Sequence, residues 1–401
     1  MSTHAKAAAK FLADRERAAW HDRALYHVRE KRDRMAHAVP EWEALRQAAS
    51  EIKLHTLSHL GRYLEEFERN ATANGMVVHW ASDAREMNRI VLPAIHVRRE
   101  EVGELFEREL GTARGDSDPT YLTHEARKHL RGKFLTADVA MTGVNFAVAS
   151  EGAFAVCTNE GNADLGTSFP DLHIAIMGLE KVVPDYRSLA VFTRLLARSA
   201  TGQPVTAYTS LYRRPEPGKQ IHVVIVDNGR TESLRNEAHR NMLKCLRCGA
   251  CMNTCPVYRR SGGYSYSYFI PGPLGINLGM LRSPERYAGN VSGCSLCYSC
   301  SNVCPARIDL GEQIYAWRQE MDADGVADTR KKLTVEGMDV VMRHKTLFYT
   351  GLKLIPWVPR FVYNNRFNPW CAGREMPHFA RRSFNELWKE GKIATEKKEK
   401  R

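Results

Sequence analysis

Eight of the ten cysteines in this 401-residue chain lie in two short runs that share one spacing. The first run reads CLRCGACMNTCP over residues 245–256, and the second reads CSLCYSCSNVCP over residues 294–305. In both runs three cysteines are each separated by two residues, a fourth follows after three more, and a proline comes next. This spacing is typical of ferredoxins, whose cysteine thiolates bind 4Fe-4S clusters. The sequence therefore predicts two 4Fe-4S clusters.

The spacing also predicts which cysteines share a cluster. Three cysteines on a tight loop can bind three irons of one cubane, while the fourth leaves on the following stretch of chain and, in two-cluster ferredoxins, binds the other cubane. Small neighbours such as Gly249 and Ser301 are expected to let backbone N–H groups approach the sulfurs. We therefore expect site 1 to consist of Cys245, Cys248, Cys251 and Cys304, and site 2 to consist of Cys294, Cys297, Cys300 and Cys255.

Zinc is the alternative metal for clustered cysteines, because structural zinc is commonly held by paired cysteines or by cysteine and histidine in groups of four. A third cysteine at the same spacing, a proline after the fourth and a duplication of the whole run favour iron–sulfur clusters instead. Clusters with only cysteine ligands have no open iron for a substrate, so their task is to transfer single electrons. The long stretch between Cys255 and Cys294 favours the helical type of two-cluster domain found in redox complexes.

The cysteine runs follow a region whose pattern predicts an α/β domain. Residues 1–70 show helical periodicity, and MVVHWAS at 76–82 predicts a strand. No glycine-rich dinucleotide turn and no phosphate-binding P-loop occur, so binding of NAD or ATP through those motifs finds no support. Beyond residue 137 the pattern predicts strands and one helix, at 188–202. The strands are expected at 138–150, 153–159, 173–178 and 221–228.

Polar residues gather beside these strands: Asn145, Glu151, Asn159, Glu160, Asn162 and His173. Two interpretations stay open. Either the residues line a small-molecule pocket, or they form the turns and hairpins that such residue types favour. The two cysteines outside the runs, Cys157 and Cys371, are expected to be buried and unreactive thiols.

Charge and hydropathy restrict the classes of partner. Lysine and arginine total 58 against 46 aspartate and glutamate, a formal charge of +12, which favours anionic partners. Much of the excess lies in residues 15–34 and 389–401, which are expected to be solvated or frayed termini. The basic residues form no stripe interleaved with aromatics, so we expect no nucleic-acid partner. Without a secretory signal or a membrane-spanning stretch, the sequence predicts a cytoplasmic protein.

The last part of the chain has an apolar segment. Residues 326–401 combine a helix with LFYTGLKLIPWVPRFVY, which prolines interrupt. This segment is expected either to pack against the cluster domain or to rest on a partner or on the inner face of the membrane.

Several stretches of the chain resemble one family, the lactate utilization protein B family of iron–sulfur proteins. They are GVNFAVASEGAFAVCTNEGNADL, HIAIMGLEKVVP, LLARSATGQ, VDNGR and CLRCGACMNTCPVYRRSGG. The similarity begins near residue 41 and continues into the C-terminal region, where SFNELWKEGK also matches. The cysteine run alone is shared by many ferredoxins, whereas its combination with TGVNFAVA and EKVVP is much more specific.

The resemblance implies a fold and a division into domains. An α/β domain of the lactate-utilization type, related to sugar-phosphate isomerases and formyltetrahydrofolate cyclo-ligases, would precede a helical two-cluster ferredoxin domain. The implied segments are a basic helical extension at 1–40, the α/β domain at 41–230, the ferredoxin domain at 231–325 and a C-terminal extension at 326–401.

The resemblance also implies a function. The chain would be a non-catalytic electron-transfer subunit that works with companion lactate-utilization subunits, an A-type cysteine-rich protein and a C-type protein, in oxidising L-lactate to pyruvate. The acceptor would be a quinone or another acceptor that is not NAD. The alternative is a stand-alone oxidoreductase with an organic-acid pocket in its α/β domain.

The chain departs from the family at one place. Between HWASDAREMNRI and VLPAIHVRREEV the family carries a further α/β stretch with a serine- and lysine-rich loop, which this chain lacks at the join of Ile90 and Val91. A helix that begins at Asp83 would have barely two turns before Pro93 disfavours its continuation. We therefore expect part of the sheet to be absent and sheet edges to be exposed.

Overall fold

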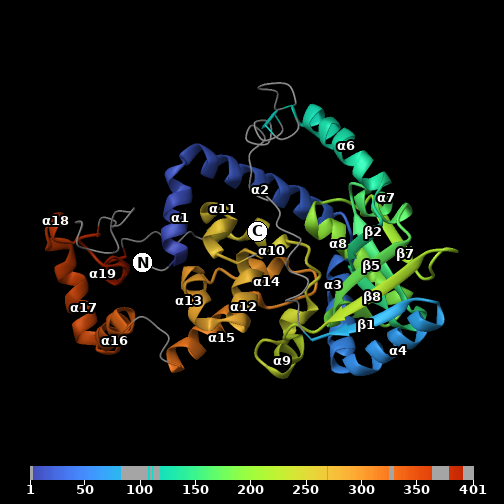
Figure 1. The fold of residues 1–401 in the computed structure, drawn as a ribbon. Helices are drawn as coiled ribbons and strands as arrows, with labels where there is room; N and C mark the ends of the chain where they lie inside the picture. Colours follow the sequence, from blue (N-terminus) through green and yellow to red (C-terminus); the bar gives the residue numbers. More distant parts are fainter. Residues whose placement is uncertain are drawn as a thin grey trace, which may run out of the picture. The chain divides into compact units, whose positions relative to one another are not determined.

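The computed structural model of the chain describes residues 3–82, 107–108, 111, 118–268, 270–324, 329–363 and 379–391. The chain forms two compact units, residues 1–323 and residues 324–401. The first unit has a helical part and an α/β part, and the second consists of helices (Figure 1).

Among the described residues, the α/β part contains two four-stranded sheets. The first is entirely parallel, with the order β1 (Val77–Ala81), β8 (Gln220–Val226), β5 (Leu172–Gly178) and β2 (Val139–Gly143). The second has the order β6 (Val182–Val183), β3 (Phe146–Val148), β4 (Ala153–Thr158) and β7 (Tyr208–Tyr212). In β5 buried residues alternate with half-buried ones, which places one side of the strand in the core. The predicted α/β fold is confirmed.

The segment predicted as one strand at 138–150 forms two strands, so that expectation was wrong in detail. Val144 N–H still donates to Ile176 O in the first sheet at 2.9 Å, whereas Asn145 N–H donates to Ala155 O in the second at 3.0 Å. The chain thus changes sheets between adjacent residues. Hydropathy cannot mark this change, because the apolar pattern continues through it.

Helices cover the sheets on several sides. The N-terminal helices are α1 (Thr3–Ala13), α2 (Arg15–His37), α3 (Trp42–Ser58) and α4 (Leu60–Ala73), as the periodicity of residues 1–70 predicts. Within the α/β part lie α6 (Pro119–Leu135), α7 (Asn162–Ser168), α8 (Tyr186–Ala200) and the 3-10 turns η1 (Ala149–Glu151) and η2 (Leu179–Lys181). Helix α4 buries Leu64 and Phe67 in a core shared with both sheets, because apolar residues three and four apart fall on one face.

Gly152 allows α4 to pack directly on the turn between β3 and β4. Its φ of +55° lies in the left-handed region, and a Cβ there would lie 2.1 Å from the nitrogen of Ala71. Gly152→Ala should therefore lower the free energy of unfolding by about 2–4 kcal/mol through backbone strain and overlap. Thermal unfolding checks this against Gly143→Ala, where a Cβ would meet nothing within 4 Å. Equal melting temperatures for the two variants would contradict the packing.

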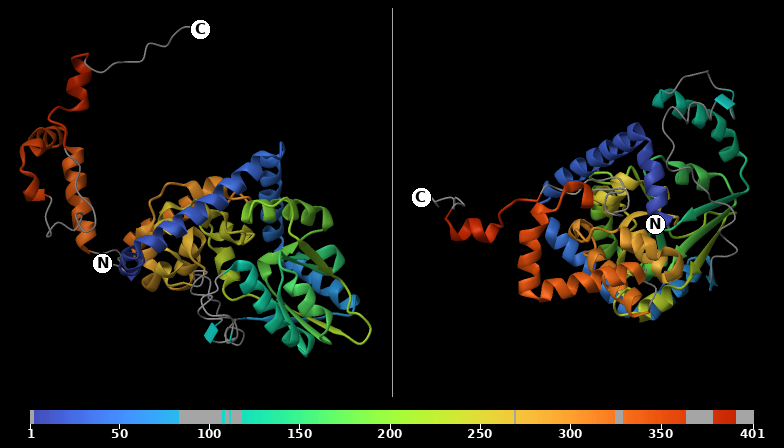
Figure 2. Two further views of the ribbon diagram at one scale, coloured as in Figure 1. Left: turned by 90° about the horizontal axis from the view of Figure 1, so that it is seen from above. Right: turned by 90° about the vertical axis from the view of Figure 1, so that its left-hand side faces the viewer.

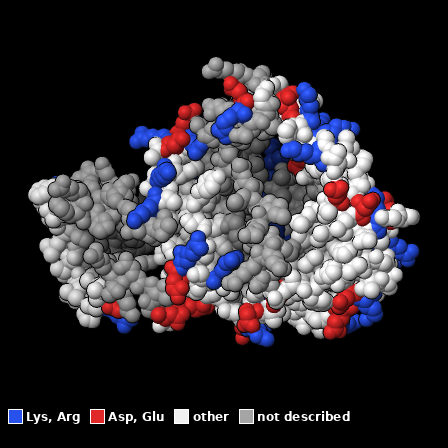
Figure 3. Space-filling model, viewed as in Figure 1, with Lys and Arg blue, Asp and Glu red and all other residues white. Residues whose placement is uncertain are grey.

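The strands at the two edges of the first sheet carry exposed apolar side chains, as expected from the absent α/β stretch. Val77 and Trp80 on β1 are 45% and 50% exposed, and Val139 and Met141 on β2 are 46% and 53% exposed. On the face seen in Figure 3, the surface over the strands is largely free of charged side chains. The join at Ile90 and Val91, and the helix expected from Asp83, lie outside the described residues.

The helical part of the first unit holds both cysteine runs. Its elements are α9 (Arg230–Arg235), η3 (Arg240–Lys244), α10 (Ala250–Thr254), α11 (Pro256–Ser261), η4 (Gly263–Tyr266), α12 (Gly272–Arg282), α13 (Pro284–Gly293), α14 (Ser299–Val303) and α15 (Leu310–Ala323). This part shares a hydrophobic core with the α/β part. In that core Phe146 and Phe192 stack with ring centroids 5.3 Å apart, and the buried residues around them include Cys300 and Cys304. The two parts therefore stabilise each other by burying common apolar surface.

Helix α2 corrects the expectation that residues 15–34 are a solvated or frayed terminus. The helix lies along α10 and α11 and reaches α8 (Figure 2). Its residues Ala18, His21 and Arg32 are buried. These positions fall on one face of a helix, and this face was hidden in the sequence because two of the three side chains are polar or charged.

In the described residues of the second unit, the elements are α16 (Thr329–Arg343), α17 (Lys345–Leu354), η5 (Ile355–Trp357), α18 (Arg360–Tyr363) and α19 (Phe384–Lys389). Several large apolar side chains are exposed in it, among them Trp357 at 71% and Phe361 at 75%. A search of the described residues finds no helix with the length and apolar character needed to cross a membrane.

Candidate metal centre

The two cysteine runs fold into loops with the same backbone conformation. In the first, Arg247 and Gly249 have φ of +62° and +78°, and in the second the equivalent Leu296 and Tyr298 have φ of +51° and +56°. Each loop then enters a short helix, α10 or α14, and ends at the fourth cysteine of its run. The sequence repeat is thus also a repeat of backbone structure.

The left-handed residues turn backbone N–H groups toward the cysteine sulfurs. Arg247 N–H donates to Cys245 Sγ at 3.3 Å, and Leu296 N–H donates to Cys294 Sγ at 3.4 Å. Hydrogen bonds of this kind favour the thiolate and tune the reduction potential of a bound cluster. Gly249 adopts its left-handed conformation at little cost, because glycine has no Cβ.

Tyr298 takes the position of Gly249 in the second loop, which the sequence did not lead us to expect. Its hydroxyl donates to Glu312 Oε2 at 3.0 Å. Its ring covers Gly311, where a Cβ would lie only 2.7 Å from the ring. These contacts hold Tyr298 in a left-handed backbone conformation that usually favours glycine.

The four cysteines predicted for site 1 line one cavity. Cys245, Cys248, Cys251 and Cys304 share a cavity of about 280 Å³ whose other walls are mostly apolar, including Leu246, Ile270, Leu274 and Ile308. Burial and the neighbouring Cys245 raise the pKa of Cys248 to about 12, and burial raises the pKa of Cys304 to about 11. The raised pKa values favour the protonated thiol of Cys248 and of Cys304 at neutral pH, so iron must displace these two protons to bind.

The four cysteines predicted for site 2 also come together. Burial, followed by the charges of Cys255, Cys294 and Cys297, raises the pKa of Cys300 to about 12. Cys300 is buried, whereas Cys297 is exposed, so this site meets the surface. Within the described ranges, no three His, Cys, Asp or Glu side chains are placed to hold a single metal ion. At site 1, the all-thiolate donor set around an apolar cavity fits a 4Fe-4S cluster.

A buried set of charges joins the α/β part to the first cysteine loop. Glu180, which is 3% exposed, pairs with Arg230 and lies 3.7 Å from Arg247 of the loop. Burial alone would raise the pKa of Glu180, but Arg230, Lys181 and Arg247 outweigh it and hold that pKa below its usual range. Lys53 Nζ donates to the carbonyl oxygens of Glu180 and Val182 at 2.5 and 3.3 Å.

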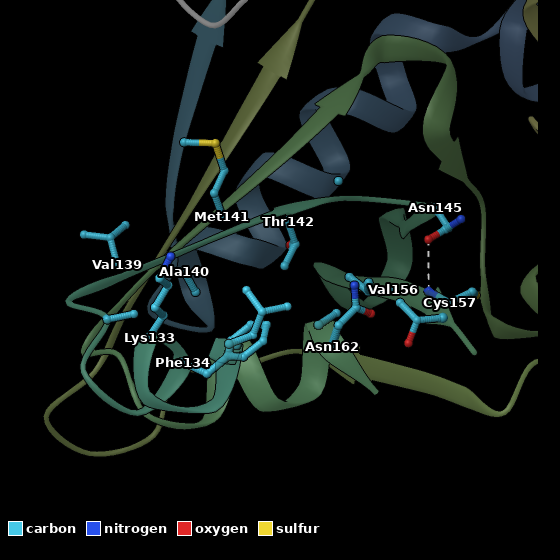
Figure 4. Close-up of a pocket in the computed structure, with 16 residues that line it drawn as sticks. Lys133, Phe134, Val139, Ala140, Met141, Thr142, Asn145, Val156, Cys157 and Asn162 are labelled. Carbon is cyan, nitrogen blue, oxygen red and sulfur yellow. Dashed lines mark hydrogen bonds between the residues drawn. The ribbon is translucent and has the colours of Figure 1, made fainter. Parts of the chain in front are cut away.

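Two side chains of the polar group predicted in the α/β part line a second cavity. Asn145 and Asn162 lie, with Cys157, in a cavity of about 550 Å³ between α6, β2, β4 and α7 (Figure 4). Asn145 Oδ1 accepts the backbone N–H of Cys157 at 2.9 Å. These two side chains therefore lie at a cavity, and binding of a small molecule there stays a prediction.

Three others in the group have structural roles on the surface, as the turn interpretation predicts. Glu151 lies 3.3 Å from Arg213, and Asn159 Oδ1 accepts the N–H of Ala207 at 3.1 Å. Glu160 accepts the N–H of Asn159 at 3.3 Å. The turn interpretation therefore describes these three residues.

His173 of this group is buried on β5, 2.7 Å from the Thr142 hydroxyl. Burial lowers its pKa from 6.5 to about 4. Above pH 6.5 the ring is neutral in both the folded and the unfolded chain, and its contribution to the free energy of unfolding is fully present. As the pH falls from 6.5 toward 4, the unfolded chain binds a proton that the folded chain does not, and this contribution is lost. Between about pH 7.5 and pH 5, wild type should lose about 2 kcal/mol more unfolding free energy than His173→Gln. Parallel pH profiles of the two proteins in urea unfolding would contradict this prediction.

The two isolated cysteines were expected to be buried thiols. Cys157 is half-buried in β4, and burial raises its pKa, which disfavours the reactive thiolate. Cys371 lies outside the described residues.

Two arginines next to site 1 were missed in the sequence. Arg32 Nη1 donates to Ala250 O at 2.9 Å, and Arg46 Nε donates to Cys304 O at 3.0 Å. They belong to α2 and α3 and are separated from their partners by 218 and 258 residues. No local pattern could signal contacts over such separations.

Two known family models match parts of the chain. A "LUD domain" model matches residues 87–232, and a "4Fe-4S dicluster domain" model matches residues 241–308. The second match indicates two 4Fe-4S clusters. Helices α2 and α3 precede both matched regions.

Similar proteins cover most of the chain. "Lactate utilization protein B" of Geobacillus thermodenitrificans is 34% identical over 381 residues, 79% of this chain and 80% of that protein. The protein of the same name from Bacillus cytotoxicus is 32% identical over 434 residues, 90% and 91% of the two chains. "Uncharacterized electron transport protein YkgF" of Escherichia coli is 31% identical over 439 residues, 92% of each chain.

One of these alignments bears on the expected internal gap. The alignment with the Bacillus cytotoxicus protein has 434 positions, but it includes only about 361 residues of this chain, which is 90% of 401. At the other positions, about 73 in number, that protein has a residue and this chain has none. This number is consistent with the absence of an α/β stretch.

Proposed function

Because the chain belongs to the lactate utilization protein B family, we propose that it is the iron–sulfur electron-transfer subunit of a complex that oxidises L-lactate to pyruvate. This oxidation releases two electrons and two protons, and two 4Fe-4S clusters can each carry one electron. The observation that carries the proposal is the pair of equivalent cysteine loops, each lying close to the fourth cysteine of the other. The A-type and C-type lactate-utilization proteins would be the companion subunits, and a quinone or another non-NAD acceptor would take the electrons.

In this proposal Cys245, Cys248, Cys251 and Cys304 hold one cluster, and Cys294, Cys297, Cys300 and Cys255 hold the other. The shared cavity at site 1 and the mutual charge effects at site 2 support these sets. The domains would be the α/β domain at 41–230 and the ferredoxin domain at 231–325, flanked by extensions at 1–40 and 326–401.

The test begins with protein purified without oxygen. About eight iron and eight sulfide per chain, with a spin-coupled EPR signal after dithionite, are expected for two cubanes. Addition of L-lactate should then reduce the clusters only when the companion subunits are present. Zinc without sulfide, or no reduction in the complete mixture, would overturn the proposal.

The second cavity favours an alternative function, a stand-alone oxidoreductase. Asn145 and Asn162 provide polar contacts, and Lys133 at the cavity wall provides a cation suited to an organic acid. This cavity runs along the whole of strand β2, from Val139 to Gly143, at an edge of the parallel sheet. Oxidation of L-lactate by the isolated chain with a dye acceptor would favour this alternative over an electron relay.

The second unit supports contact with an anionic membrane surface, where a quinone would be reached. Trp357 and Phe361 are exposed in the same unit as the exposed basic residues Lys345 and Lys353. Arg381 lies over the Trp357 ring at 5.6 Å. Aromatic and basic side chains together favour the lipid interface. The protein should pellet with phosphatidylserine vesicles, and Trp357→Glu should weaken this. Equal pelleting of wild type and variant would argue against the contact.

A further inference from the structure

Resting on the proposed function, we propose that Arg32 and Arg46 of the N-terminal helices raise the reduction potential of the cluster at site 1. They act as positioning and charge-compensating residues, through hydrogen bonds to the backbone of the cysteine loops. The N-terminal helices would thereby be a working part of the electron-transfer site, although they lie outside the matched ferredoxin region.

Arg46 makes the more direct contact. Its Nε and Nη2 atoms donate to Cys304 O at 3.0 and 2.9 Å, and Nη2 also donates to Asn302 O at 2.7 Å. Its side chain is only 12% exposed. Glu43 accepts a hydrogen bond from Arg46 at 2.7 Å, and its side chain is 63% exposed. Because water screens the exposed carboxylate more than the buried guanidinium, a positive charge remains next to the cysteine loop.

Arg32 reaches the first loop from α2. The residue is 3% exposed, and Nη1 donates at 2.9 Å to the carbonyl oxygen of Ala250, which lies between Cys248 and Cys251 in the chain. Its carboxylate partner Asp33, at 2.6 Å, is 41% exposed. Two guanidinium groups therefore approach the backbone of site 1 from two helices.

These contacts matter because reduction adds a negative charge to a cluster in an apolar cavity. Burial disfavours added charge, and a nearby cation in a medium of low dielectric offsets that cost. Arginine suits this role because it stays protonated. Lys53 is also close, but burial and Lys181 lower its pKa to about 7, so it gives a less constant charge.

Site 2 has its own arginine and so provides an internal comparison. Arg318 of α15 donates from Nη2 to Cys294 O, and to Val291 O at 3.1 Å. Each site thus has an arginine on a ligand carbonyl, at Cys304 in site 1 and at Cys294 in site 2. Replacement of one arginine should mainly change the potential of its own cluster.

The experiment is an EPR-monitored redox titration of the full chain with both clusters loaded. Arg46→Gln should lower one of the two midpoint potentials by about 59 mV, a tenfold change in the ratio of reduced to oxidised cluster. Arg32→Gln should lower the same potential, and Arg318→Gln should lower the other. Arg307→Gln is the matched control, because the Arg307 side chain contacts Gln47 and Glu43 on the same surface. Its backbone N–H donates to Cys304 O at 3.1 Å, a contact that the variant keeps.

Iron and sulfide per chain are measured for every variant. If Arg46→Gln does not load its clusters, Arg46→Lys and Arg32→Gln decide the result. The inference is overturned if loaded variants keep both potentials, or if Arg46→Gln and Arg318→Gln change the same one. Loss of iron and sulfide in wild type would instead overturn the proposed function, so the two failures are distinguishable.

Discussion

Replacing Cys245 and Cys255 together should remove both clusters, whereas replacing Cys245 and Cys304 together should remove only one. The first pair belongs to one run of the sequence but to two proposed sites. The second pair belongs to two runs but lines one cavity. Iron per chain should therefore fall from about eight to near zero in the first double alanine variant, and to about four in the second.

The two double variants control for each other, because each removes two thiols from the chain. If each run bound its own cluster, the result would be reversed: the Cys245/Cys255 variant would keep about four irons and the Cys245/Cys304 variant would lose nearly all. Sulfide analysis and EPR distinguish a remaining cubane from iron bound nonspecifically. Circular dichroism shows whether both variants keep their helices.

Glu180→Gln should lower the free energy of unfolding by about 3–5 kcal/mol. The carboxylate is buried between Arg230 and Arg247, and glutamine keeps its shape but removes its charge. Two guanidinium groups would then share a buried space without a counter-charge. Because Arg247 belongs to the first cysteine loop, this loss also weakens the attachment of site 1 to the α/β part.

Urea unfolding followed by tryptophan fluorescence measures the effect. Glu151→Gln is the matched control, because Glu151 pairs with Arg213 at 3.3 Å with side chains 30% and 52% exposed. Exposed pairs contribute about 1 kcal/mol or less, so this variant should stay close to wild type. Similar losses for both variants would show that the Glu180 network is not the buried link described above.

The shared core has a consequence for the shortened α/β part. Phe146 and Phe192 of this part pack in one cluster with Cys300 and Cys304 of the cysteine runs. This core lies beside the second sheet, whereas the exposed edge strands β1 and β2 belong to the first. The exposed edge strands therefore belong to a different sheet from the one that packs against the residues of the metal centre.

The sequence determined the elements and the metal chemistry because both depend on short-range pattern. Helical periodicity and strand alternation reflect which side of a local element is buried, and they predicted the N-terminal helices and every strand of the first sheet. In the second sheet they predicted β3 and β4 but missed β6 and β7. The spacing of the cysteines reflects the size of a cubane and the reach of a tight loop, so it predicted iron–sulfur clusters.

Only the tertiary structure decided what surrounds the metal centre. The change of sheets at Val144 and Asn145, and Tyr298 in a left-handed conformation, depend on neighbours that are remote in sequence. Arg32 and Arg46 read as surface charges, yet they meet carbonyl groups 218 and 258 residues away. Helix packing brings these groups together, and a charged residue gives no local signal of whether its partner will be water or a buried carbonyl.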